Sequence, residues 1–485
     1  MAHVTFIDQT IRDGQQSLWG MRMRANQILP IADDLDRSGF SCVEITGTTI
    51  HTVLVREFAE DPYQGLDLIS AKLPNVLRRG GMRPDTAGFM LQPYSVIDLS
   101  VSVMAKHGIN SFWLFDCLFN LDRMERLATV IGKQGHEVVP TISFALSEVH
   151  TDEYYGSVAR AMASWPHVDA IMLADEAGVL TPERAETLLP ALIEAAGDVP
   201  IELHCHNTTG LAPVVYLRGI ELGITRIHTC IGGLANGPSL PSAEVMLDNV
   251  LALGHTTDLE DGALPDIARH LEFVAQREGY ELGVPNEYSV RNFTNQMPGG
   301  MTGTLKAQLA KHGRLDVFDE VLEEVGRVRK EFGYPVMATP FAQILGTQSV
   351  LNVLTGDRYS VAPDETVLYA MGAYGEPPVA MDPNVKDRIL STRRGHELRD
   401  WELPQPSLEE LRLQYGGPSL SDEELLLRIL VPGPAVDAMI AAGPIDTSYP
   451  RADESPLVEA LRQISRSSAK NIDVHHGGFE LSLRR

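Results

Sequence analysis

Apolar segments of strand length alternate with helical segments across the first 255 residues, and no other feature constrains the fold as strongly. Eight β–α units of this spacing predict a (β/α)8 TIM barrel within an α/β chain. The expected strands are Val4–Ile7, Ser41–Ile45, Val76–Arg79, Ser111–Phe115, Val138–Ser143, Ala170–Leu173, Ile201–His204 and Arg226–Cys230.

Helical stretches are expected between these strands. Examples are Asn26–Arg37, Val96–Lys106, Asp122–Lys133, Tyr155–Trp165, Pro182–Ala196, Ala212–Leu222 and Ser242–Leu253. A doubly wound sheet is the competing fold, but it would need a glycine-rich phosphate turn after the first strand. The segment IRDGQQS there supplies none, so the barrel is favoured.

The rest of the chain divides into further parts. We predict a barrel over residues 1–290, a mainly α-helical C-terminal domain over 291–440 and a tail over 441–485. The tail could pair as an edge strand, contact a partner or be mobile. Within these parts we expect a transition at 256–290, a turn at Asn295–Leu305, helices at Leu309–Phe332, Gln343–Leu354 and Asp422–Ala442, an exposed connection at Pro377–Pro406 and an amphipathic stretch at Leu457–Ile464.

Composition argues against several functional classes. The chain has 485 residues, 44% of them hydrophobic, and a formal net charge of −25. This negative charge disfavours binding to nucleic acid or to an anionic membrane surface. No apolar run reaches transmembrane length, and no signal segment precedes the first strand, so we expect a cytoplasmic protein. The four cysteines form no C-x-x-C pair, which argues against a disulfide framework.

Polar residues follow the first predicted strand directly, in the segment Val4–Ser17. This is the layout of a βα-barrel active site, whose residues come from the carboxyl ends of strands. Asp13 can hold a cation, and Arg12 can hold a carboxylate or a developing enolate oxygen. A surface turn that carries a salt bridge is the alternative reading.

The segment LHCHN places His204 and His206 two residues apart at the end of a predicted strand. Side chains at i and i+2 of a strand share one face, so both imidazoles can bind one ion. With Asp13 they form an N2O ligand set that suits Zn, Mn or Co and leaves positions open for water or substrate. A pair of hydrogen-bonded histidines at a strand end is the alternative.

Together, DQTIRDGQQS and LHCHNTTG on a barrel resemble the metal-dependent superfamily of 3-hydroxy-3-methylglutaryl-CoA lyase and isopropylmalate synthase. Three further segments, MPGGMTGTL, ATPFAQILGTQSVLNVLTGDRY and AYGEPP, resemble the biotin-dependent carboxyltransferases. That family includes the carboxyltransferase domain of pyruvate carboxylase, the alpha subunit of oxaloacetate decarboxylase and the pyruvate-binding subunit of transcarboxylase. The resemblance covers residues 1 to about 440.

The resemblance implies roles for individual residues. Asp13, His204 and His206 would bind the metal. Thr339 would act in catalysis by moving a proton between biotin and the enol of pyruvate. The pocket for the oxoacid and carboxyl-biotin would be lined by Arg12, which is also catalytic, and by the substrate-binding residues Gln16 and Arg79. We expect Thr339 to face the same cavity as the metal, with Arg12 and Arg79 close by.

The chain also departs from the family pattern. Ala174, in IMLADEAGVLTP, stands where the family has a carbamylated, metal-ligating lysine. Water, a substrate carboxylate, Asp175 or Glu176 would then fill that space. Gln15 replaces a common histidine, and Phe341–Ala342 replaces a pair of small hydroxyl residues. The sequence has no biotinyl segment of the A-M-K-M kind, so a separate carrier protein would bring any biotin.

The resemblance implies a metal-dependent enzyme that transfers a carboxyl group to, or decarboxylates, a small 2-oxo acid of the pyruvate or oxaloacetate type through an enolate. It would be the carboxyltransferase component of a multi-subunit biotin system and a homodimer. Thr339, Arg12 and the long C-terminal match favour this reading. Ala174 favours two alternatives, which are a biotin-independent lyase, decarboxylase or aldol-type synthase, and a non-catalytic partner subunit.

Overall fold

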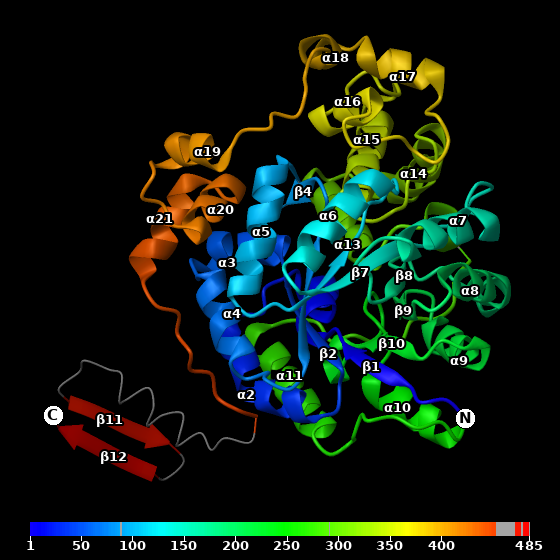
Figure 1. The fold of residues 1–485 in the computed structure, drawn as a ribbon. Coiled ribbons are helices and arrows are strands. Elements are labelled where there is room, and N and C mark those ends of the chain that lie inside the picture. Colours follow the sequence, from blue (N-terminus) through cyan, green and yellow to red (C-terminus); the bar gives the residue numbers. More distant parts are fainter. Residues whose placement is uncertain (88–89, 291, 453–470, 477–478, 485) are drawn as a thin grey trace.

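The predicted barrel is confirmed in the computed structural model, which describes residues 1–87, 90–290, 292–452, 471–476 and 479–484. Eight parallel strands close in the order β1-β10-β9-β8-β7-β6-β3-β2 (Figure 1). Their bounds are β1 Thr5–Asp8, β2 Cys42–Gly47, β3 Leu77–Met82, β6 Ser111–Leu114, β7 Glu137–Ser143, β8 Ile171–Asp175, β9 Ile201–Cys205 and β10 Arg226–Thr229.

The side chains of each strand alternate between the surrounding helices and the barrel interior. On β8, Ile171 and Leu173 belong to the main hydrophobic core, whereas Met172 and Ala174 belong to a small separate cluster. On β9 the outward residue is Leu203, so Glu202 and His204 share the inward face. This alternation directs the two predicted metal-binding histidines toward the barrel axis.

Helices surround the barrel, and several begin at a side-chain cap. Thr151 and Thr181 accept hydrogen bonds from the backbone N–H groups of Tyr154 and Arg184, which would otherwise lack partners. The bounds are α2 Ala25–Arg37, α3 Thr48–Phe58, α4 Pro62–Ser70, α5 Tyr94–Lys106, α6 Leu121–Lys133, α7 Asp152–Ala163, α8 Pro182–Ala196, α9 Ala212–Leu222, α10 Ala243–Ala252 and α11 Leu264–Glu278.

Two boundaries in the barrel region differ from the predictions. Strand β3 continues past Arg79 because Gly80 and Gly81 pack closely against neighbours. A Cβ at Gly81 would lie 2.4 Å from the Trp113 ring, so a residue without a side chain is needed there. Helix α11 occupies the segment expected to be a transition. Its buried Ile267 and Leu271 recur at helical spacing and join the barrel core.

The chain after the barrel is mainly helical, as predicted, and its first part lies at the carboxyl ends of the strands. The Gln296 side chain hydrogen-bonds both backbone groups of Leu146, in the loop after β7. The bounds are α12 Asn292–Asn295, α13 Gly299–Lys311, α14 Phe318–Glu331, α15 Phe341–Thr355, α16 Asp364–Met371, α17 Pro383–Leu390, α18 Arg393–Leu398, α19 Leu408–Tyr415, α20 Asp422–Leu430 and α21 Gly433–Ala442.

Several predictions for this region are wrong. The segment expected as an exposed connection contains α17 and α18, which begin at the capping residues Asp382 and Thr392 and bury Ile389. The expected turn at Asn295–Leu305 includes the first half of α13. The helical stretch predicted from Asp422 to about Ala442 is confirmed, and it divides into two helices because Val431 leaves the helical conformation before Pro432. Helices α20 and α21 return to pack on α5 and α3 (Figure 1).

The described residues of the tail add no edge strand to the barrel. Strands β11 (Asn471–His476) and β12 (Phe479–Arg484) pair with each other as an antiparallel hairpin, set apart from the barrel in Figure 1. The expected amphipathic stretch Leu457–Ile464 lies outside the described residues. Domain boundaries at residues 290 and 440 stay predictions. Across the part of the chain that is described, no helix has the length and apolar character to cross a membrane.

Replacing Leu203 by Ala should destabilise the barrel by about 2–5 kcal/mol, because it leaves a cavity between β9 and the helices. Leu203 is fully buried, and its side chain closely approaches Gly219 of α9. Urea denaturation should show this loss as a lower midpoint. The control Leu253→Ala changes a side chain that is 55% exposed and should shift stability by less than about 0.5 kcal/mol.

Candidate active site

The polar segment after β1 folds into a tight helical turn that returns its side chains over the barrel. Thr10–Gly14 forms a π-helical turn, η1, and Gln15–Trp19 follows as the short helix α1. Gly14 permits the turn to lie close to the chain after β10, since a Cβ there would lie 3.0 Å from the Leu234 carbonyl oxygen. Arg12 and Asp13 are therefore buried at the carboxyl end of the barrel and do not form a surface turn.

The structure brings Asp13, His204 and His206 together. One ligand atom from each lies within 4.8 Å of the other two, and all three side chains are buried. Asp13 Oδ2 is 3.6 Å from His204 Nε2, and Asp13 Oδ1 is 3.3 Å from His206 Nε2. This is the only group of three such residues with metal-binding geometry in the described parts of the chain.

The donor atoms of this cluster fit a divalent metal. His206 Nδ1 lies 2.6 Å from the Pro238 carbonyl oxygen and must donate to it, so in the neutral imidazole Nε2 keeps its lone pair for a metal. His206 Nε2 is buried, and no described residue gives it a well-aligned hydrogen bond. Burial alone would raise the pKa of Asp13, but Arg12 and both histidines outweigh it and hold the pKa well below its usual value. Asp13 is thus an anionic ligand.

Arg12 supports this cluster from one side. Its Nη2 lies 3.0 Å from Asp13 Oδ2 and donates to Gln9 Oε1 at 3.1 Å, while its Nε pairs with Glu44. The guanidinium also lies over the Trp113 ring, 5.2 Å from its centroid. These contacts hold Arg12 between two carboxylates, where it orients Asp13.

The two residues predicted to bind substrate are not in the cluster. Gln16 is exposed on α1, whereas neighbouring Gln15 is buried. Arg79 is 1% exposed and points into the barrel interior, where it donates to Ser111, Glu137 and Glu202. Its nitrogens donate to these protein partners, and the predicted role of Arg79 in substrate binding stays a prediction.

Ala174 pairs with His204 in the β8–β9 register. The position where the family has a metal-ligating lysine is therefore next to the metal cluster. Trp113 packs against the cluster that contains Ala174. Asp175 accepts from the backbone of its own loop, and Glu176 accepts from Ser143 Oγ at 2.9 Å, so neither joins the metal cluster. What fills the position of the family lysine beside the metal cluster stays a prediction.

Thr339 lines a second, small cavity of about 20 Å³. The cavity is lined by Arg83, Asp85, Thr86, Phe115, Asp116, Cys117, Thr339, Pro340, Phe341 and Tyr374, and it does not include the metal cluster. The expectation that Thr339 faces the same cavity as the metal stays a prediction. The two sites are linked by stacked groups, because Arg12 lies over Trp113, Arg83 lies over Phe115, and the two rings are 5.1 Å apart.

Several functional candidates were missed from the sequence. Arg83 and Asp85 follow β3, and Asp116 follows β6. Asp13 was predicted from the same kind of position, shortly after a strand. Arg83 has no ion-pair partner among the described residues, whereas Asp85 pairs with Arg123 at 2.5 Å. Burial, with a smaller contribution from Asp85, raises the pKa of Asp116 to about 7. The polar residues that follow each strand were the sequence signal that could have identified these candidates.

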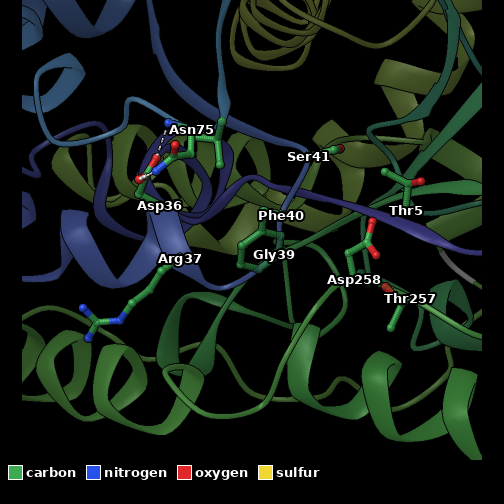
Figure 2. Close-up of a pocket in the computed structure, with 10 residues that line it drawn as sticks. Thr5, Asp36, Arg37, Gly39, Phe40, Ser41, Asn75, Thr257 and Asp258 are labelled. Atoms are coloured by element: carbon green, nitrogen blue, oxygen red, sulfur yellow. Dashed lines mark hydrogen bonds between the residues drawn. The ribbon is translucent and has the colours of Figure 1, made fainter.

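A larger cavity lies at the other end of the barrel. It measures about 420 Å³ and is lined by residues that precede or begin strands, among them Thr5, Ser41 and Asn75 (Figure 2). In TIM-barrel enzymes, active sites form at the carboxyl ends of the strands. Cavity volume therefore does not identify the active site here, whereas the metal cluster does.

Comparisons with known proteins decide the family. The family model described as "Conserved carboxylase domain" matches residues 293–478, and the "HMGL-like" model matches residues 120–271. A pyruvate carboxylase component from Methanocaldococcus jannaschii, one of the separate chains of that enzyme, is 34% identical over 89% of this chain and 77% of its own length. This chain belongs to the biotin-dependent carboxyltransferase family.

A further relative and a solved structure support this family membership. The methylmalonyl-CoA carboxyltransferase 5S subunit of Propionibacterium freudenreichii subsp. shermanii is 30% identical over 88% of this chain and 86% of that protein. The carboxyl transferase domain of Rhizobium etli pyruvate carboxylase, solved with oxamate and biotin, has a TM-score of 0.81 and 25% identity, covering 93% of this chain and 79% of that domain. The carboxylase match reaches residue 478, beyond the expected limit near 440.

Replacing His206 by Ala in this carboxyltransferase should remove most bound metal, because two neutral imidazoles supply much of the affinity of an N2O site. Metal content after equilibration with Zn, Mn or Co would be measured by mass spectrometry. His396→Ala, a histidine on α18 far from the cluster in the chain, should leave the content unchanged. Equal metal in both variants would contradict the assignment.

The raised pKa of Asp116 predicts a pH-dependent stability difference. An acid whose pKa rises on folding stabilises the protein fully below its unfolded value near 4, and this contribution is lost as pH rises through about 7. Asp116→Asn should therefore gain stability relative to the natural protein between pH 4 and 7, as measured by urea denaturation at several pH values. The exposed Asp122→Asn should show no such trend.

Proposed function

We propose that this chain is the carboxyltransferase component of a multi-subunit biotin-dependent system. It would move a carboxyl group between carrier-borne biotin and a small 2-oxo acid of the pyruvate or oxaloacetate type, through an enolate. The single observation that carries this proposal is the buried Asp13–His204–His206 cluster at the carboxyl end of the barrel, in a chain that aligns with the Methanocaldococcus pyruvate carboxylase component over most of both lengths.

The proposed metal centre uses Asp13, His204 and His206 to hold Zn, Mn or Co. When bound, such an ion supplies a Lewis acid for the oxygen of a 2-oxo acid and for the charge of its enolate. The protein's part is to present one carboxylate and two bare imidazole nitrogens from different strands. Arg12 keeps Asp13 ionised and oriented, which preserves an anionic ligand beside the neutral ones.

The cavity at Thr339 supports proton transfer next to a flat ring. Thr339 Oγ1 accepts from Gln343 Nε2 at 3.1 Å, so its own proton is free to be donated. The aromatic side chains of Phe115, Phe341 and Tyr374 form apolar walls around it. We propose that the hydroxyl moves one proton between biotin and the enol, and that Arg83, which lacks an ion-pair partner among the described residues, contacts the anionic group.

Ala174 favours a second candidate, a biotin-independent metal-dependent lyase or decarboxylase. With alanine there, the cluster provides three protein ligands, and neither Asp175 nor Glu176 completes it. Such an enzyme would turn over the oxoacid without carboxyl-biotin. Oxaloacetate decarboxylation measured with and without free biotin separates the two candidates, because only the first requires an acceptor for the carboxyl group.

The proposal also names partners. Two archaeal relatives are, by name, each one component of a pyruvate carboxylase, which supports a separate biotin carrier protein as partner here. A homodimer in the cytoplasm is part of the same proposal. Light scattering coupled to size-exclusion chromatography would test the homodimer, for which a mass near twice 53.2 kDa is expected.

Thr339→Ala should lower biotin-dependent oxaloacetate decarboxylation by at least about 100-fold, since a positioned acid–base group typically contributes that much. Metal content and the unfolding midpoint should not change. The matched control is Thr355→Ala, which alters an exposed threonine near the end of α15. An unchanged rate in Thr339→Ala, with turnover that ignores biotin, would favour the biotin-independent candidate.

A further inference from the structure

A chain of hydrogen bonds runs from His204 into the barrel interior, away from the proposed metal. His204 Nδ1 lies 3.2 Å from His228 Nδ1, and His228 Nε2 lies 3.1 Å from Glu202 Oε2. His228 is on β10 and Glu202 on β9, and both are fully buried. Metal-binding histidines commonly use their second ring nitrogen in this way, and the partner decides which nitrogen is protonated.

The proton on His228 is placed by Glu202. Two arginines surround this carboxylate, since Arg79 Nη1 donates to Oε2 at 2.6 Å and Arg226 Nη1 donates to Oε1 at 3.3 Å. A carboxylate held by two guanidinium groups accepts hydrogen bonds only. His228 Nε2 therefore carries a hydrogen and donates it to Glu202.

The other nitrogen of His228 is defined independently by Gln9. The Gln9 amide can lie in only one orientation, because its Oε1 accepts from Arg12 and its Nε2 donates to Glu44 Oε2 at 2.7 Å. The same Nε2 lies 2.8 Å from His228 Nδ1. An amide nitrogen can only donate, so His228 Nδ1 is an acceptor, and Gln9 and His204 share its single lone pair.

An acceptor at His228 Nδ1 determines the state of His204. At 3.2 Å from that lone pair, His204 Nδ1 must carry a hydrogen. His204 Nε2 is then bare, and it is the nitrogen that faces Asp13. We propose that His228 is a positioning residue that fixes His204 in the Nδ1–H tautomer, with Glu202 and Gln9 fixing His228 in turn.

This inference rests on the proposed metal centre and deepens it. It gives a structural function to Arg79, which neutralises Glu202 at the far end of the chain of hydrogen bonds. It also explains why a TIM-barrel interior, usually filled by branched apolar residues, here contains a histidine and a carboxylate. A lost acceptor at His228 would release His204 to its other tautomer and weaken metal binding about 10- to 100-fold.

The first test is a Co²⁺ titration of metal-stripped protein, followed by visible absorption. His228→Phe removes the acceptor and should raise the Kd by about 10- to 100-fold, whereas His228→Gln offers a carbonyl oxygen and should recover most of that loss. The control Thr141→Val alters another inward, buried side chain, whose hydroxyl has no hydrogen-bond partner among the described residues, and should leave the Kd unchanged. Equal Kd values for His228→Phe and the natural protein would overturn the proposal.

The second test needs no disruptive variant. In metal-free protein labelled with ¹⁵N at histidine, the nitrogen shifts should show hydrogen on Nδ1 of His204 and on Nε2 of His228, with signals assigned through His204→Gln and His228→Gln. Hydrogen on Nε2 of His204 would overturn the proposal even if His228→Phe does not fold. A natural protein that binds no Co²⁺ but shows these tautomers would refute the metal centre while leaving the tautomer assignment intact.

Discussion

The pairing of Arg12 with Asp13 and Glu44 is the constraint on which the active site depends. All three side chains are buried, and an unpaired charge in such a place is so costly that the group would neutralise or the turn would open. Removing one member of a buried pair typically costs about 3–5 kcal/mol for this reason. The π-helical turn after β1 is thus held over the barrel by the same charges that prepare Asp13 to bind a cation.

The charges below that turn form a continuous polar layer through the barrel. Gln9 links Arg12 to His228, and Glu202 links His228 to Arg79. Such a network is stable only when every donor and acceptor is satisfied, so each member restricts its neighbours. Hydrogen bonds are directional, whereas apolar packing is not, so such a network fixes the orientation of its side chains. A barrel built this way can hold His204 in one tautomer without any contact from solvent.

The sequence predicted the barrel well because each strand is an apolar run between turn signals, and it placed all eight strands. The i, i+2 spacing of His204 and His206 was equally informative, since strand geometry alone puts them on one face. The surroundings of Arg79, in contrast, could not be predicted from the sequence. Its position on a predicted strand resembles that of a substrate-facing residue. Only tertiary contacts reveal that its guanidinium forms ion pairs with Glu202 and Glu137. The packing of Trp113 against the cluster that contains Ala174 was unpredictable for the same reason, since Trp113 comes from a strand two positions away in the barrel.

The balance of charge at the site explains how so acidic a chain can act on an anion. Asp13 and Glu44 contribute two negative charges and Arg12 one positive charge, so a divalent ion turns the cluster net positive. A ligating carbamate would cancel that surplus, and Ala174 cannot supply one. Arg83 adds a further positive charge with no partner among the described residues. Because salt screens exposed charges beyond about 8 Å, the remote surface acids that give the chain its net charge of −25 hardly oppose this local field. Loss of the lysine thus makes the centre a stronger attractor for an anionic oxoacid.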